Sequence, residues 1–271
     1  MERIKRNERL SVMLDILSQT PNRIHTLGRF CELFGAAKST VSEDIEVLRS
    51  ALSHFDRGEI TTVAGAAGGV RYRATIGIER ARGELKKLAE VLSSPDRLLP
   101  GGFLYMSDVT SNPEIVQTLG QLLAQLYYAE RPDFVLTMET KGIPIAMMTA
   151  KMLDVPLVIA RRDSRAYEGS AVKINYIGSG EKIETMALAR RSVSAGQRAL
   201  IIDDFTKGGG TLQGMVDMMR EFQADVVGVG VMIATATPVV KRVQGAKSLL
   251  TLQTVDAGSG IVRVTPSDIY Q

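Results

Sequence analysis

Residues 199–211 hold two adjacent carboxylates followed by three consecutive glycines, the grouping in this sequence best suited to chemistry. The apolar residues before Asp203 predict a buried strand over 199–202 that ends at the acidic pair. Asp203 and Asp204 can accept hydrogen bonds from two neighbouring sugar hydroxyls. Backbone N–H groups of the glycine segment can surround an anion, and a helix predicted over 211–222 adds its dipole. A diol beside a phosphate predicts a site for a ribose 5-phosphate.

Two other polar segments are predicted to reach the same site, because each follows a strand of the same sheet. Lys141 and Gly142 lie between a strand over 134–137 and a helix over 143–153, a turn suited to a pyrophosphate. Arg161 and Arg162 follow a strand over 157–160, where guanidinium groups commonly bind phosphate. The alternative for this arginine pair is a solvated, ion-pairing face.

The strand, acidic pair and glycine–threonine loop resemble the phosphoribosyl pyrophosphate signature of type I phosphoribosyltransferases. In catalytic purine members of that superfamily, the position matching Lys207 is usually small or acidic. A lysine adds attraction for a polyanion but supplies no obvious general base, unless it is simply solvated. Phe205 and Phe103 could each offer a flat face to a nucleobase, although core packing explains them equally well. We therefore expect a site that holds a ligand without performing the transfer.

Strand and helix patterns alternate from about residue 114, which predicts an α/β domain with a mainly parallel sheet and its ligand at the carboxyl ends of the strands. A polar excursion over 163–185 occupies the place of the mobile active-site flap in type I phosphoribosyltransferases. Besides the elements above, the predicted elements are a helix over 77–93, a helix over 114–129, a strand over 226–233 and a strand near 249–255.

Residues 1–75 predict a different domain, with three short helices and a glycine-tipped hairpin that together indicate a winged helix-turn-helix. The third helix buries Val41, Ile45, Leu48 and Leu52, and Ser39 or Thr40 is expected to cap it, with Glu43 completing a capping box. With those four residues facing inward, Glu43 and Glu46 point outward from the helix, and Asp44 lies near them.

This domain is expected to read duplex DNA with its third helix in the major groove. Residues 38–52 carry two basic and three acidic side chains, so either Glu43 reads a cytosine or the hairpin and N-terminal arm carry the affinity. A domain that only mediates dimerisation is the alternative. The predicted DNA-contacting residues are Lys38, Ser39, Thr40, Ser42, Arg49, Arg71, Arg73 and Arg6.

Composition limits the kinds of ligand, metal site and cellular location that this sequence allows. The whole net charge of +3 arises within residues 1–97, which carry 16 Lys or Arg against 13 Asp or Glu, a balance that permits nucleic-acid binding without proving it. Cys31 is the single cysteine and there are two histidines, so neither a disulfide framework nor a cysteine zinc cluster is expected, and no metal site is predicted. With no apolar leader or membrane-length apolar run, a cytoplasmic location is expected.

From about residue 2 to 255 the sequence is similar to the purine operon repressor family of Gram-positive bacteria. Domains are then expected at 1–75 (winged helix-turn-helix) and 76–271 (phosphoribosyltransferase-like), with a connecting helix in 76–98. The resemblance implies a homodimer on purine-box operator DNA, released by phosphoribosyl pyrophosphate, with guanosine tetraphosphate competing for the pocket. No cofactor is required, although Mg²⁺ can accompany bound phosphoribosyl pyrophosphate. The segments that carry the resemblance are residues 37–44, 65–70, 99–102, 140–144 and 201–205.

The effector site expected from this resemblance and from the motifs comprises Asp203, Asp204, Phe205, Lys207, Gly208, Gly209, Gly210, Thr211, Lys141, Gly142, Arg161, Arg162 and Phe103. Three alternatives stay open. The chain could be an active purine or xanthine phosphoribosyltransferase with an accessory domain, a transcriptional activator of the same genes, or an RNA-binding regulator, the last fitting less well because winged helices chiefly read duplex DNA.

Overall fold

A computed structural model describes residues 4–65, 68–163, 169–178, 182–256 and 258–270. The chain forms two compact units, one of Met1–Gly77 with Lys151–Asp154 and one of Ile78–Ala150 with Val155–Gln271. No described helix has the length and apolarity needed to cross a membrane.

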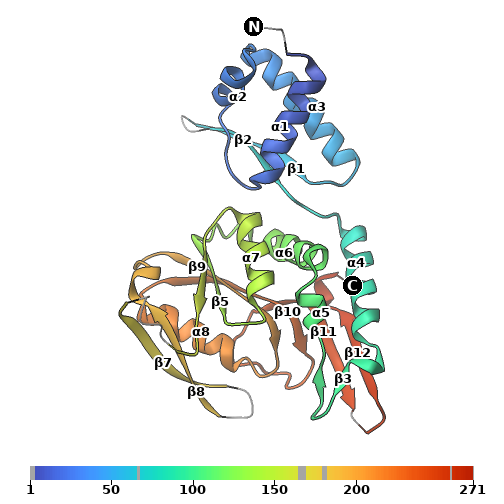
Figure 1. Ribbon diagram of the computed structural model, residues 1–271, viewed down its shortest axis with the longest axis vertical. Coiled ribbons are helices and arrows are strands. Elements are labelled where there is room, and N and C mark those ends of the chain that lie inside the picture. Colours follow the sequence, from blue (N-terminus) through green and yellow to red (C-terminus); the bar gives the residue numbers. More distant parts are fainter. Residues whose placement is uncertain (1–3, 66–67, 164–168, 179–181, 257, 271) are drawn as a thin grey trace. The chain divides into compact units, whose positions relative to one another are not determined.

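The N-terminal unit holds α1 (Arg6–Gln19), α2 (Leu27–Phe34) and α3 (Lys38–His54), followed by an antiparallel hairpin of β1 (Glu59–Val63) and β2 (Gly69–Arg73) (Figure 1). The Thr26 side chain caps α2 by accepting from the Arg29 N–H, and Gly35 ends that helix in the left-handed conformation. The four apolar residues predicted to face inward on α3 are all buried.

The predicted cap of α3 is wrong. This helix begins at Lys38 with Ala37 in the N-cap position, and no side chain caps it. Because α2 ends at Phe34 and Gly35 already reverses the chain, the turn is complete before Ser39 is reached. Ser39 and Thr40 therefore lie in the first turn of the helix and not before it.

Asp44 is also placed differently from the prediction. Its side chain is 1% exposed, where it accepts hydrogen bonds from Arg6 Nε at 3.0 Å and Arg9 Nε at 2.7 Å. A buried carboxylate is tolerated only when it is paired, and two guanidinium groups of α1 satisfy this one. Asp44 thus fastens α1 to α3.

The second unit is built on a six-stranded sheet of order β12-β11-β10-β9-β5-β6. All neighbours are parallel except the edge strand β12, which pairs antiparallel with β11. This confirms the predicted α/β fold with a mainly parallel sheet. The strands are β5 (Phe134–Met138), β6 (Leu157–Ala160), β9 (Arg198–Thr206), β10 (Asp225–Thr235), β11 (Lys247–Asp256) and β12 (Ile261–Pro266).

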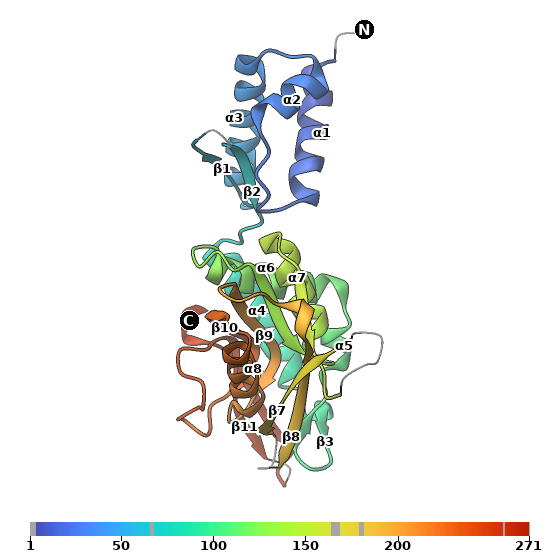
Figure 2. The same ribbon diagram turned by 90° about the vertical axis from the view of Figure 1, so that its left-hand side faces the viewer.

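Helices pack on both faces of this sheet (Figures 1 and 2). Alternate residues of β9 serve the two faces. Ile201 belongs to a core with Met215 and Met219 of α8, whereas Ile202 lies at Gly230 beside Leu123 of α6. The helices of this unit are α4 (Ile78–Leu92), α5 (Ser107–Thr110), α6 (Pro113–Tyr127), α7 (Ile143–Leu153, of which residues 151–153 group with the first unit) and α8 (Gly210–Glu221).

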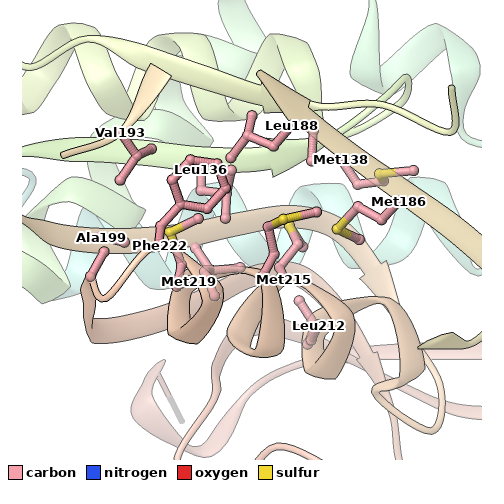
Figure 3. Packing of buried hydrophobic residues seen from close by; sticks show 14 of the residues in the cluster. Leu136, Met138, Met186, Leu188, Val193, Ala199, Leu212, Met215, Met219 and Phe222 are labelled. Atoms are coloured by element: carbon pink, nitrogen blue, oxygen red, sulfur yellow. The ribbon is translucent and has the colours of Figure 1, made fainter. Parts of the chain in front are cut away.

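The segment predicted as a mobile flap contains an ordered hairpin, β7 (Ala171–Ile177) with β8 (Ile183–Ala189). Several of its apolar side chains join the α8 core, among them Tyr176 and Leu188, and Figure 3 shows Met186 of β8 near Met215 of α8. The expectation of one polar excursion without strands over 163–185 is therefore wrong, and the place of a flap there stays a prediction. Residues 164–168 and 179–181 of that excursion lie outside the described part of the chain.

Two further strands, β3 (Leu98–Leu99) and β4 (Phe103–Leu104), form a small separate hairpin. Neither this hairpin nor the edge strand β12 is predicted from the sequence.

Candidate functional site

The acidic pair lies inside β9 and not beyond its end. Pairing of β9 with β10 continues to Thr206, opposite Ala234, so the strand runs four residues further than the apolar run that predicts it. Asp203 and Asp204 are consequently buried, at 7% and 8% exposure. The prediction that β9 ends before the acidic pair is therefore wrong, because both carboxylates belong to residues within the strand.

Burial sets the electrostatics of both carboxyl groups. It raises the pKa of Asp203 well above the ordinary range, and the neighbouring Asp204 carboxylate raises it further. Burial also raises the pKa of Asp204, while the charge of Lys141 opposes this shift. Two poorly solvated carboxyl groups side by side favour partners that bring hydroxyl donors or positive charge.

The 139–142 loop, which contains the cis Glu139–Thr140 peptide bond, closes against this pair. A Cβ atom on Gly142 would lie 2.6 Å from Asp203 Oδ1 and 2.6 Å from Thr137 Oγ1, so only glycine permits this approach. The hydroxyl of Thr137 is fully buried and has no hydrogen-bond partner among the described residues. Lys141 and Gly142 are thus brought to the acidic pair.

Arg161 and Arg162 follow β6 and meet the same loop through Glu139. The Arg161 guanidinium lies 3.3 Å from Glu139 Oε2, and the Arg162 backbone N–H donates to Glu139 Oε1 at 2.8 Å. Arg161 also pairs through its backbone with Ala187 of β8. Arg162 is exposed.

The glycine segment forms the start of α8, which begins at Gly210, one residue earlier than predicted. Gly209 holds a left-handed conformation at the N-cap, with φ of 83°, and no side chain caps the helix. The first N–H groups of an α-helix have no partner within the helix, so the start of α8 is suited to an anion. Only glycine fits at position 210, because an added Cβ would lie 2.0 Å from the Ile177 carbonyl oxygen. Lys207 is exposed, and Thr211 is partly exposed.

The two aromatic candidates differ in position. Phe205 is partly exposed on β9, directly after the acidic pair. Phe103 is 70% exposed on β4, so it is not a core residue. Its hairpin lies beside the end of β11, because a Cβ on Gly102 would be 4.0 Å from Val255 Cγ1. Phe103 therefore belongs to the same edge of the sheet, with β9 and β11 separated by β10.

The sequence reasoning missed Lys241. Its Nζ donates to the Lys207 carbonyl oxygen at 2.6 Å, and the next residue, Arg242, donates its backbone N–H to the Gly208 carbonyl at 3.0 Å. Both residues follow β10, so the rule that ligands bind at the carboxyl ends of parallel strands could have pointed to this segment.

The predicted DNA-contacting residues fall into two groups. Lys38 and Ser39 are exposed at the start of α3, with Thr40 and Ser42 partly exposed. The arginines are tied to protein groups: Arg49 Nε donates to the Ile60 carbonyl oxygen at 2.9 Å, which joins α3 to β1. The remaining contacts are Arg6 with Asp44, Arg73 with Glu59 at 3.6 Å and Arg71 Nε with Thr61 Oγ1 at 3.5 Å.

Comparisons with known proteins match both units. Residues 5–74 match the family described as bacterial purine repressor, N-terminal, and residues 106–266 match the phosphoribosyl transferase domain. The purine biosynthesis transcriptional repressor PurR of Bacillus subtilis is 39% identical over 255 residues, covering 94% of this chain and 90% of that protein. The chain belongs to the PurR family of purine biosynthesis regulators. A Lactococcus lactis PurR described as a transcriptional activator is 37% identical, covering 98% of this chain and 99% of that protein.

Relatives and structures without the N-terminal unit are more distant. The xanthine phosphoribosyltransferase of Geobacillus thermodenitrificans is 31% identical over 187 residues, covering 66% of this chain and 96% of that enzyme. The crystal structure of an adenine phosphoribosyltransferase from Giardia lamblia, complexed with 9-deazaadenine, superposes with a TM-score of 0.53 at 18% identity. It covers 66% of this chain and all of that one, and it shows a shared fold.

Proposed function

We propose that this protein is a DNA-binding regulator of purine biosynthesis genes that senses phosphoribosyl pyrophosphate at the phosphoribosyltransferase-type site. The observation that carries the proposal is the approach of Gly142 to Asp203, which places the 139–142 loop beside the buried acidic pair. The uncapped start of α8 follows along the same strand. Carboxyl acceptors, a turn with a lysine and free helix N–H groups suit a ribose with phosphates on both sides.

Each part of the ligand has a matching group in this proposal. Residues 208–211 hold the 5-phosphate, and the acidic pair accepts from the ribose hydroxyls. Lys141 with Arg161 or Arg162 meets the pyrophosphate. If the ligand carries Mg²⁺, Asp203 and Asp204 would be the residues that offer the hard oxygen atoms this ion prefers. Phe205 and Phe103 are available to the base of a nucleotide such as guanosine tetraphosphate, the proposed competitor.

The site is proposed to bind without transfer. Lys207 stands where a small or acidic residue is usual in the purine enzymes, and a cationic ammonium cannot accept the proton of a purine base. The relatives that match the chain along nearly its whole length are described as transcriptional regulators, which agrees with this assignment.

Regulation requires that the ligand distinguish two states of the protein. We propose a homodimer whose N-terminal units, as winged helix-turn-helix domains, bind paired purine-box operator sites. The start of α3 contacts base edges there. Phosphates are contacted by four arginines that also bond to groups of the protein, Arg49, Arg71, Arg73 and Arg6. Phosphoribosyl pyrophosphate must bind the released arrangement more tightly, because equal affinity for both states shifts nothing.

An electrophoretic mobility shift with a purine-gene operator tests this proposal. We expect the protein to shift operator DNA, and millimolar phosphoribosyl pyrophosphate with Mg²⁺ to release it. Guanosine tetraphosphate should restore the complex. If calorimetry shows binding of phosphoribosyl pyrophosphate but the DNA affinity does not change, the regulatory proposal is wrong.

A second candidate, catalytic transfer, is favoured by the similarity to a xanthine phosphoribosyltransferase. Incubation with a purine base, phosphoribosyl pyrophosphate and Mg²⁺ distinguishes the two, because an enzyme forms nucleotide and pyrophosphate. The sign of control is a separate question, since one relative is described as a repressor and another as an activator. A reporter fused to the operator, with and without the protein, decides it.

A further inference from the structure

The segment over 236–246, between β10 and β11, is hydrogen-bonded to the backbone at the start of the glycine loop. The hydrogen bonds from Lys241 Nζ and the Arg242 N–H end on consecutive carbonyl groups, those of Lys207 and Gly208. Val243 and Ala246 pack against the buried core beneath, so the segment has its own anchor in the domain. The backbone at the start of the loop is therefore held by a fixed neighbour.

Among the described residues, the ammonium group of Lys241 has only neutral acceptors. Besides the Lys207 carbonyl, it donates to the Thr235 carbonyl oxygen at 2.8 Å and to Thr235 Oγ1 at 3.0 Å. These three bonds use all three donors of an ammonium group. Among the ion pairs of the described residues, none joins Lys241 to a carboxylate.

Its charged neighbour is another cation. Burial lowers the pKa of Lys241, and the positive charge of Lys207 lowers it further. Two cations at one loop repel each other, and the partly desolvated one gains most when an anion arrives. The protein thus keeps a fixed positive charge behind the loop, and a bound phosphate is the group that would neutralise it.

We propose that Lys241 is a positioning and specificity-determining residue of the effector site, which holds the glycine loop in place and supplies the charge that selects a phosphorylated sugar. This inference rests on the proposed function for the placement of a sugar phosphate at that loop. Lys241 donates to the loop backbone at Lys207, so it acts through that residue, while the neighbouring Arg242 N–H holds the Gly208 carbonyl.

Calorimetric titration with ribose 5-phosphate at several salt concentrations tests the assignment. The variant Lys241→Gln retains a donor but loses the charge, and Lys241→Arg retains the charge. We expect the Gln variant to bind about tenfold more weakly, the size of one charge-assisted interaction, and to show a smaller dependence on salt. The Arg variant should bind within about threefold of the wild type with an unchanged salt dependence. Lys87→Gln, an exposed change on α4, is the matched control and should bind like the wild type.

Thermal melts confirm that each variant is folded, and Lys241→Met replaces the Gln variant if that one does not fold. The assignment is overturned if the neutral variant binds ribose 5-phosphate like the wild type, if the Arg variant loses as much affinity as the neutral one, or if the wild type does not bind. Failure of the proposed function gives a different result. In that case the neutral variant still binds more weakly, but phosphoribosyl pyrophosphate does not release operator DNA from the wild type.

Discussion

Gly142 is the residue on which the geometry of the proposed effector site depends most directly. Its α-carbon lies so close to the Asp203 carboxyl and the Thr137 hydroxyl that a methyl group would overlap both. The 139–142 loop can approach the acidic pair only while this position lacks a side chain. The nearby backbone and buried strand leave little room for either neighbour to move.

We therefore expect Gly142→Ala to weaken phosphoribosyl pyrophosphate binding at least tenfold while operator binding persists. Displacing the loop by even about 1 Å removes several contacts to the ligand at once. Calorimetry measures the first property and a mobility shift the second. Gly83→Ala is the matched control, since a Cβ on this α4 residue meets nothing within 4 Å. It should raise helix stability by about 0.5–1 kcal/mol and leave ligand binding unchanged. Wild-type affinity in Gly142→Ala would contradict the site geometry.

Asp203 carries a cost to stability that depends on pH. Because burial raises its pKa, the folded state binds the proton more tightly than the unfolded chain does. Stability is then lost as pH rises from the ordinary carboxyl value of 3.8 through the raised value, and the loss persists above it. Asn cannot ionise, yet its side-chain oxygen can still accept the Asp204 N–H.

We expect Asp203→Asn to melt about 2–4 °C higher than the wild type at pH 8, the shift that about 1 kcal/mol gives in a chain of this size. The difference should shrink toward pH 4. Scanning calorimetry across this range measures it, and Asp225→Asn, at an exposed position, is the matched control. A destabilised Asp203→Asn at pH 8 would show that the ionised carboxylate is already compensated within the protein.

At the scale of elements, the join between α1 and α3 rests on Asp44. Its removal would leave Arg9, whose side chain is 12% exposed, without its carboxylate, although Arg9 still donates to the Ile4 carbonyl oxygen, and would release the half-exposed Arg6. Loss of one member of a buried ion pair costs more than the pair contributes, because the remaining charge stays desolvated.

Asp44→Ala should therefore lower the free energy of unfolding of the N-terminal unit by about 3 kcal/mol, near the lower end for buried pairs because Arg6 reaches solvent. Chemical denaturation followed by circular dichroism measures this change. The neighbouring Glu43→Ala, at an exposed position, should alter stability by less than about 0.5 kcal/mol. Equal effects of the two substitutions would show that the Asp44 pairs contribute nothing.

Local sequence predicts the elements whose signals are local. The apolar run before Asp203 gives β9, and the spacing of Val41 and Ile45 gives the buried face of α3. The apolar run predicts an end of β9 that is too early, because pairing with β10 extends the strand and no local pattern encodes this pairing. Burial of Asp44 depends on arginines of another helix, and the role of Lys241 depends on a loop 34 residues earlier. The strands of the hairpin β7–β8 are not predicted because they mix polar residues with those that cover α8.

At the scale of the whole molecule, a DNA-binding unit and a phosphoribosyltransferase-type unit share one chain, as in the PurR relatives that match it along nearly its full length. In the proposed function, ligand binding at the acidic pair lowers the affinity of the protein for DNA, whereas the acidic pair is not needed for DNA binding itself. This claim separates the roles of the two units.

The most direct test is a titration of operator complexes with phosphoribosyl pyrophosphate, comparing the wild type with the double variant Asp203→Asn/Asp204→Asn. Both proteins should bind the operator with the same affinity in the absence of ligand. The wild type should release DNA as the ligand concentration rises, whereas the double variant should stay bound throughout. Release of the double variant at the wild-type ligand concentration would contradict the account.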